Sequence, residues 1–446
     1  MAKAKIQPTI THDQFSTETN EIGAVNLPVT EKDRQRILSL GREWAGLAAS
    51  DEMSEKKRWW KAANDLEMEV PLVMFEPYDV VGFIVEEDIQ CEHPLLRNVE
   101  RLMLYQLKQV KFVKDDAVLE NWFRIPWRIK SSGFGIDIED THVEGSIAYR
   151  SNFPLRTPED ISKLTPCEYI VDRERSLELK KILEDIWGDI LPVRIGNVDW
   201  YFPDYGYNPF TGNYVDSLTA NLFRLLGFER WCLWMVDSPD DIHAICRFLT
   251  DDRIRFFKWL EDEQLLDFSN DSQFVVPSGY GYMSGLPGMD SPGPARLKDI
   301  WGWMSSQEGV VLSPAMFEEF VLPYLSEMGG MFGVNGYACC EPVEDRIELV
   351  KKWIPNVRNF SVTHWNKSPE RVAELIGSDF VYITKPLPAF LSGPAPDWDS
   401  AKKELERHWA CAKGLNVEFT VRDAIDVRDH ETLPKWVELC KSIVGR

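Results

Sequence analysis

The last third of the chain alternates between short apolar, β-branched runs and longer segments whose apolar residues recur at helical spacing. The apolar runs predict strands over residues 334–340, 357–364, 380–384 and 417–421. The segments after them predict amphipathic helices over residues 343–354, 369–376, 400–412 and 431–444. Strands joined by helices run parallel, and right-handed crossovers place successive strands side by side. Such repeats occur in doubly wound sheets and in barrels. No Gly-x-Gly-x-x-Gly motif follows the first strand of any unit, which weakens the case for a dinucleotide-binding doubly wound sheet. We therefore expect an α/β fold of the (β/α)₈ (TIM) barrel type.

The first half is less regular, and we expect it to supply an N-terminal helical extension and long inserted loops. Thr30, with Asp33 three residues later, predicts the start of a capped helix. An apolar run over residues 70–75 lies well before the first strand-then-helix unit. A helix is predicted over 173–187, whereas the aromatic, Gly- and Pro-rich residues 190–215 predict a long loop. The predicted division is an arm (1–28), an extension packed on the barrel (29–150) and the barrel itself (151–446).

Composition and charge limit the classes of partner. The formal net charge is −22, and an acidic surface repels the phosphates of nucleic acids and anionic lipids. The N-terminus has no apolar region typical of a signal peptide, and no stretch approaches the ~20 apolar residues of a membrane span. The eight cysteines are scattered without a Cys-x-x-Cys motif. We therefore expect a cytoplasmic protein that binds neither nucleic acid nor membrane.

The ends of the predicted strands carry the candidate chemistry, because barrel enzymes act at the carboxyl ends of their strands. Cys339, Cys340 and Glu341 follow the first strand of the repeat, and His364 follows the second. Thiolate, carboxylate and imidazole together are a ligand set suited to Zn²⁺, and residues 339 and 341 would share one face of an extended strand. The alternative is that the cysteines pack as small apolar side chains and Glu341 begins the next helix.

Lys385 and Arg422 stand at the ends of the third and fourth strands. They could hold a carboxylate or phenolate oxygen of a ligand, or form ion pairs with Asp423, Asp426 or Glu418. Tyr337 and Trp365, with Trp301 and Trp303, could line a flat ligand, or they could belong to the core. Gln307 and Asp423 complete the candidate substrate-binding residues. The Gly- and Pro-rich segment 279–303 predicts a loop, mobile over the barrel mouth or static on the surface.

Several of these segments resemble the uroporphyrinogen-decarboxylase family in the broad sense. The resemblance covers roughly residues 155–446, and its most specific segments are KDIWGWMSSQEGVVLSPAMFEEFVLPY from Lys298, GYACCEP, NFSVTHW, VYITKPLPAFL and NVEFTVRD. The subgroup resembled serves corrinoid-dependent methyl transfer. The resemblance implies a methyltransferase that moves a methyl group from a small donor, such as a methoxylated aromatic compound, to cobalamin carried by a separate corrinoid protein.

The family also contains enzymes whose features this chain lacks. The chain has no counterpart to the N-terminal arginine-rich motif of the porphyrinogen decarboxylases. In the coenzyme M methyltransferases, zinc is bound by a His-x-Cys pair and a later Cys; the corresponding positions here are Tyr337, Cys339 and a position near Thr384 or Lys385. The resemblance leaves two alternatives open: a different zinc set that uses Glu341 and His364, or no metal at all. Relatives with this barrel are often homodimers.

Three functions follow as hypotheses. The first is methyl transfer to a corrinoid protein, with Glu341 or His364 as proton donor or metal ligand and Trp365 and the 190–215 loop against an aryl ring. The second is a cofactor-free decarboxylase or lyase acting on a carboxylated small molecule. The third is a ligand-binding relative without catalytic activity.

Overall fold

The structure is a computed structural model, and it describes residues 28–77, 80–142, 149–196, 218–277, 279–337, 339–424 and 426–446. Its centre is a six-stranded parallel sheet in the order β1-β14-β13-β12-β11-β10. These strands are β1 (Leu72–Phe75), β10 (Trp301–Met304), β11 (Val334–Tyr337), β12 (Val357–Thr363), β13 (Val381–Lys385) and β14 (Asn416–Val421). The fold is therefore mixed α/β, and the four predicted strand-then-helix units of the last third are confirmed.

A second parallel sheet contains only two strands, β2 (Phe123–Pro126) and β7 (Val193–Gly196). Within the part of the chain that the structure describes, this pair has no ladder to the six-stranded sheet, so the predicted closed barrel is not confirmed. The first strand of the chain nevertheless lies beside the last, since β1 pairs with β14. The sheet thus includes a strand from the predicted extension, while the boundary at residue 150 stays a prediction.

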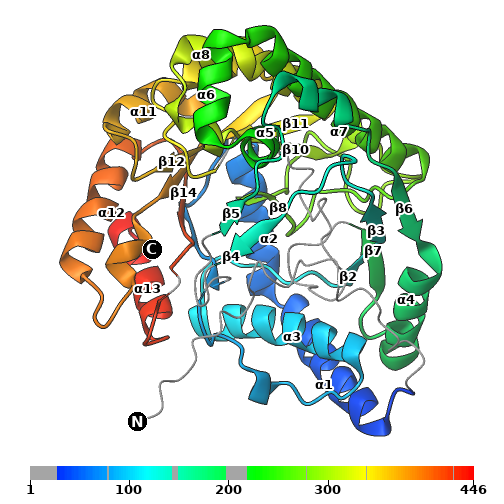
Figure 1. Cartoon of the computed structure of the whole chain (residues 1–446). Helices are drawn as coiled ribbons and strands as arrows, with labels where there is room; N and C mark the ends of the chain where they lie inside the picture. The colour runs from blue at the N-terminus through cyan, green and yellow to red at the C-terminus, as the bar shows by residue number, and fades with distance from the viewer. Residues whose placement is uncertain are drawn as a thin grey trace, which may run out of the picture.

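Helices surround the strands, and Figure 1 shows α1, α3, α4, α7, α8, α11 and α12 around the periphery. The first seven helices are α1 (Glu31–Ala48), α2 (Asp51–Asn64), α3 (Pro94–Lys108), α4 (Arg173–Trp187), α5 (Leu218–Leu226), α6 (Phe228–Asp237) and α7 (Pro239–Asp262). The others are α8 (Pro314–Phe320), α9 (Leu322–Gly329), α10 (Ile347–Trp353), α11 (Pro369–Ile376), α12 (Trp398–Ala412) and α13 (Thr432–Val444). The capping box of Thr30 and Asp33 at α1 is confirmed.

The two faces of the six-stranded sheet have different neighbours. On the helical face, the Tyr382 hydroxyl lies 3.0 Å from His408 Nδ1 of α12, and Phe75 packs edge-on against Trp436 of α13. Because side chains alternate along a strand, the residues next to Tyr382 in β13, such as Ile383, face the other way. Ile383 clusters there with Val276 and Trp303.

A short antiparallel hairpin, β8 (Phe274–Val276) and β9 (Gly279–Tyr280), covers this inner face. A Cβ on Gly336 would lie 2.1 Å from Val276 Cγ1, so glycine is required for the approach. The predicted loop over 279–303 is therefore wrong for this part of the segment. Tyr280 and Tyr282 are buried, and Trp301 Nε1 donates to the carbonyl of Gly281 at 3.0 Å. The aromatic residues bury the segment in spite of its glycines and prolines.

A buried ionic cluster ties the hairpin to β2. Arg124 donates to Asp267, with Nε and Oδ2 3.1 Å apart, and to Asp271, which lies shortly before β8. Asp271 is fully buried, and burial raises the pKa of its carboxyl to about 6 against the opposing charge of Arg124. The ion pairs of Arg124 therefore connect β2 to the segment that leads into the hairpin, in the interior of the fold.

The remaining strands form two further antiparallel pairs in the N-terminal half. They are β3 (Arg128–Ser131) with β6 (Tyr169–Asp172), and β4 (Asp140–His142) with β5 (Tyr149–Ser151). The predicted loop over 190–215 is wrong at its start, where β7 forms because it can pair with β2. The rest of that prediction, including the aromatic loop at 197–215, lies outside the described residues. No helix in the described ranges is long and apolar enough to cross a membrane.

Candidate functional site

The candidate site lies where β11, β12, β13 and β14 end. Because these strands are parallel, their carboxyl ends meet at one edge of the sheet. Cys340 follows β11, and its Sγ lies 3.9 Å from Asp423 Oδ2, which follows β14. Lys385, the last residue of β13, donates to the carbonyl of Cys339 with a distance of 3.3 Å. The structure therefore brings together the residues that the sequence assigns to three different strand ends.

His364 and Trp365 extend this cluster beyond β12. The two rings lie 4.4 Å apart between centroids, and Trp365 is 63% exposed. Burial lowers the pKa of His364, and the negative charge of Asp423 opposes this effect. The imidazole is thus mostly neutral at pH 7, beside an aromatic surface open to solvent.

The two adjacent cysteines differ in acidity. The hydrogen bond to the Cys339 thiol, with help from the charges of Lys385 and Arg422, lowers the pKa of Cys340 to about 7 in spite of burial and of Asp423. The same contact and burial raise the pKa of Cys339, whose Sγ also lies 2.7 Å from Gln307 Oε1. Cys340 is therefore the more nucleophilic thiol, since the thiolate is the reactive form.

We expect Cys340 to react with iodoacetamide at a rate that reaches half its maximum near pH 7. Lys385→Met should move this midpoint to higher pH, because the variant removes a positive charge that favours the thiolate. Peptide mass spectrometry after timed alkylation measures the rate. Cys411 is the internal control, since burial raises the pKa of its half-buried thiol. Equal pH profiles for Cys340 and Cys411 would contradict the assignment.

The two cations of the site have different partners. Lys385 is buried, whereas Arg422 Nε lies 3.7 Å from Glu76 Oε2 and 3.7 Å from Asp423 Oδ1. The pairing of Arg422 with Asp423 was one of the two sequence-based alternatives, while Asp426 instead pairs with Arg428 at 3.3 Å. Both distances are long for charged hydrogen bonds, so each of these two contacts is an ion pair.

Asp423 has an uncommon backbone conformation of a kind that is often found at functional sites. Its φ is +60°, in the left-handed region that only a few per cent of non-glycine residues adopt. Aspartate tolerates this region better than most residues because its short carboxylate can bond locally. The turn points the carboxylate back towards Cys340, so the strained residue lies at the centre of the cluster.

Glu341 and Tyr337 have supporting positions. Strand β11 ends at Tyr337, so residues 339 and 341 do not lie on one extended strand as the sequence suggested. Glu341 is buried and accepts a hydrogen bond from the backbone N–H of Ser306 at 2.8 Å. Tyr337 is fully buried, and its hydroxyl donates to Ser306 Oγ at 3.3 Å. These two side chains hold the segment that carries Gln307.

The predicted zinc set does not fit this arrangement. Among the described residues, no three His, Cys, Asp or Glu side chains form a group that could hold a metal ion. Glu341 is directed to Ser306 and Cys339 to Gln307, so the two side chains do not converge with His364. Metal binding by Cys339, Cys340, Glu341 and His364 therefore stays a prediction.

Two carboxylates near the sheet were not assigned a site role from the sequence. Glu76 follows β1 and reaches Arg422, and Glu418 lies on the inner face of β14. Applying the strand-end rule to the apolar run 70–75 would have found Glu76. No sequence signal distinguishes Glu418, because its setting depends on the hairpin that covers it.

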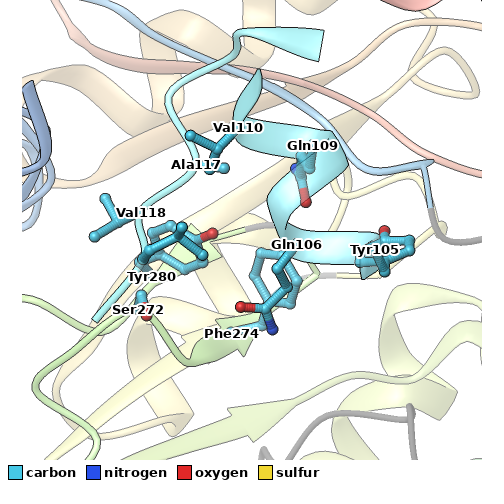
Figure 2. A pocket seen from close by; sticks show the side chains of 10 residues that line it. Tyr105, Gln106, Gln109, Val110, Ala117, Val118, Ser272, Phe274 and Tyr280 are labelled. Atoms are coloured by element: carbon cyan, nitrogen blue, oxygen red, sulfur yellow. The ribbon is translucent and has the colours of Figure 1, made fainter. Parts of the chain in front are cut away.

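A small cavity lies away from this cluster, between the end of α3 and the hairpin. Figure 2 shows Tyr105, Gln106 and Gln109 on one side and Phe274 and Tyr280 on another. Its volume of about 30 Å³ holds no more than a few water molecules. It is too small for a substrate, and the strand-end cluster is the better candidate for chemistry.

Comparisons with known proteins give a limited result. No protein-family model matches the chain, and no curated protein matches it. Among solved structures, a methyltransferase from Methanosarcina mazei is similar, with a TM-score of 0.48 and 15% sequence identity. The match covers 87% of this chain and 98% of that chain.

Proposed function

We propose that the protein is a methyltransferase whose active site is the strand-end cluster of β11 to β14. The observation that carries the proposal is the grouping of Lys385, Arg422, Asp423, His364 and Cys340 at one edge of a parallel sheet. Two cations beside an exposed aromatic ring suit a small donor with an anionic or developing anionic oxygen. The motifs shared with the corrinoid-linked subgroup also support this reading.

The chemistry requires stabilisation of a departing oxygen. When the bond between the methyl carbon and the ether oxygen breaks, the oxygen keeps the electron pair. Arg422 would stabilise that charge, and the neutral imidazole of His364 can donate an N–H hydrogen bond to the departing oxygen. Lys385 would hold the carboxylate of a benzoate donor. Trp365 offers a surface for an aryl ring. Reduced cobalamin on a separate corrinoid protein would supply the nucleophile that accepts the methyl group.

The test is methyl transfer from 4-hydroxy-3-methoxybenzoate to a reduced corrinoid protein, followed by chromatography of the demethylated product. We expect Lys385→Met to lower the rate by about 100-fold, because the donor's carboxylate loses the cation that positions it and misplacement by about 1 Å causes a loss of this size. Lys413→Met is the matched control, because Lys413 is an exposed lysine beyond α12. Turnover without a corrinoid protein, or equal rates for both variants, would contradict the proposal.

Decarboxylation is the second candidate, because Lys385 and Arg422 would also hold a carboxylate. It predicts release of CO₂ from a carboxylated substrate without any corrinoid protein.

Metal analysis of the protein purified without chelators addresses the zinc prediction. One zinc per chain that is lost in Glu341→Ala and His364→Ala would support a Lewis acid at this site.

A further inference from the structure

The inner face of the sheet, below the candidate site, carries buried polar atoms that have no hydrogen-bond partner in the described part of the chain. The atoms are Asn359 Oδ1, Ser361 Oγ and Thr363 Oγ1 of β12, and Glu418 Oε2 and Thr420 Oγ1 of β14. All five side chains are at least 97% buried, and these atoms have no hydrogen bond to any residue that the structure describes. We call this set the inner polar face.

Strand register places the inner polar face directly beneath the candidate site. Ser361 is level with Ile383, and Ile383 is level with Glu418, so these form one row. Thr363 is level with Lys385, and this next row towards the site also contains Thr420. Two residues along a strand span about 7 Å, which is the separation between the row of Glu418 and the row of Lys385.

Among the residues that the structure describes, none places a counter-charge beside Glu418. Its neighbours across the sheet are Leu72 and Ile383, and a Cβ on Gly279 of the hairpin would lie 3.4 Å from Oε2. Burial is the sole cause that raises the pKa of Glu418, to about 8. A buried carboxyl without a hydrogen bond destabilises the folded state, as does each buried hydroxyl. No residue that the structure describes supplies the missing partners, so a bound ligand can supply them.

The chemistry of the set selects the ligand. Hydroxyl and amide groups are neutral, and a carboxyl that holds its proton is neutral and both donates and accepts hydrogen bonds. A charged ligand group would be poorly solvated there, whereas a hydroxyl group can donate to one oxygen and accept from another. We propose that the inner polar face, with Thr363 and Thr420 nearest the site and Glu418 in the row below them, binds a neutral hydroxyl group of the substrate.

This inference rests on the proposed function and narrows its substrate class. A benzene ring separates para substituents by about the distance between the two rows, so a ligand anchored at Lys385 through its acidic group can reach towards Glu418. The matching donor is a methoxylated benzoate with a hydroxyl group opposite the carboxylate. Compounds that lack this hydroxyl leave the inner polar face unpartnered and bind more weakly.

The experiment compares the binding of 4-hydroxy-3-methoxybenzoate and 3-methoxybenzoate to the full chain by isothermal titration calorimetry. We expect the natural protein to bind the hydroxylated compound at least tenfold more tightly. Glu418→Leu should remove most of this preference, whereas Glu418→Gln should keep part of it, because the amide can still donate and accept hydrogen bonds. Thr384→Val is the matched control, since Thr384 Oγ1 is also buried and has no hydrogen bond within the described ranges, but lies on the opposite face of β13. It should retain the preference.

The outcomes separate the two proposals. Equal affinity of the natural protein for both compounds, a preference retained in both Glu418 variants, or ordered water alone at the inner polar face in a crystal soaked with the hydroxylated compound would overturn the inference. So would a failure of both compounds to bind. Hydroxyl-dependent binding without methyl transfer to any corrinoid protein would instead overturn the proposed function and leave the inner polar face as a binding site.

Discussion

Glu418→Gln is expected to make the protein more stable than the natural chain at pH 8 and to leave its stability little changed at pH 4. The carboxyl of Glu418 is fully buried, and burial raises its pKa from 4.5 to about 8. In the unfolded chain the same group ionises near pH 4.5, so the folded state holds one more proton than the unfolded state between these values. Stability therefore falls as the pH rises through this window.

The expected magnitude follows from the shift. A displacement of this size corresponds to about 5 kcal/mol between pH 4 and pH 8 as an upper limit, and local relaxation brings the observed value to roughly 3–5 kcal/mol. Glutamine has nearly the same shape but no charge to lose, so the variant should lack this part of the pH dependence. Urea denaturation at pH 4, 6 and 8 measures the difference.

The matched control for this prediction is Glu438→Gln, because Glu438 is exposed on α13. It should shift the free energy of unfolding by less than about 0.5 kcal/mol at every pH. A loss of stability in Glu418→Gln at pH 8 would show that the carboxyl has a structural partner. A gain would identify Glu418 as a residue that the fold keeps at a cost, which is common for residues retained for binding or catalysis.

The local patterns in the sequence predict much of the fold. The bounds of α4 and α11 follow from apolar periodicity and from caps, which act within a few residues. The strands β11 to β14 are found because each is a short apolar run between helices. The hairpin is missed because its burial depends on Gly336 and on contacts across the fold, while its own glycines and prolines indicate a loop.

The residues of the candidate site likewise fall into those that local sequence predicts and those that it does not. Cys340, Lys385 and Asp423 are found by their places at strand ends, which parallel pairing brings together. Glu341 was assigned to the same cluster because β11 was predicted to run to residue 340. The strand ends at Tyr337, and the turn after it directs Glu341 to Ser306. Glu76 meets Arg422 through the pairing of β1 with β14, a long-range contact that local sequence does not encode.

Arg124→Met is expected to destabilise the protein by about 3–5 kcal/mol, because it leaves two carboxylates in the interior without their counter-ion. Arg124 bonds to Asp267 and to the fully buried Asp271, and these contacts connect β2 with the segment that leads into the hairpin. Without the arginine, the pKa of Asp271 should rise further above its present value of about 6. The loss should therefore be larger at pH 8 than at pH 5, where the carboxyl takes up a proton.

The register of the sheet provides the control for this variant. Arg194 of β7 is level with Arg124 of β2, but its partner Asp290 is exposed and lies 3.2 Å away. Arg194→Met should cost less than about 1 kcal/mol, since solvent screens an exposed ion pair. Adding Asp271→Asn to Arg124→Met should recover part of the loss, because the amide removes the buried charge. Equal losses for Arg124→Met and Arg194→Met, measured by urea denaturation, would contradict the role of Arg124 as the anchor of the hairpin. A larger loss for Arg124→Met would show that the hairpin, and with it the cover over Glu418, depends on this buried ion pair.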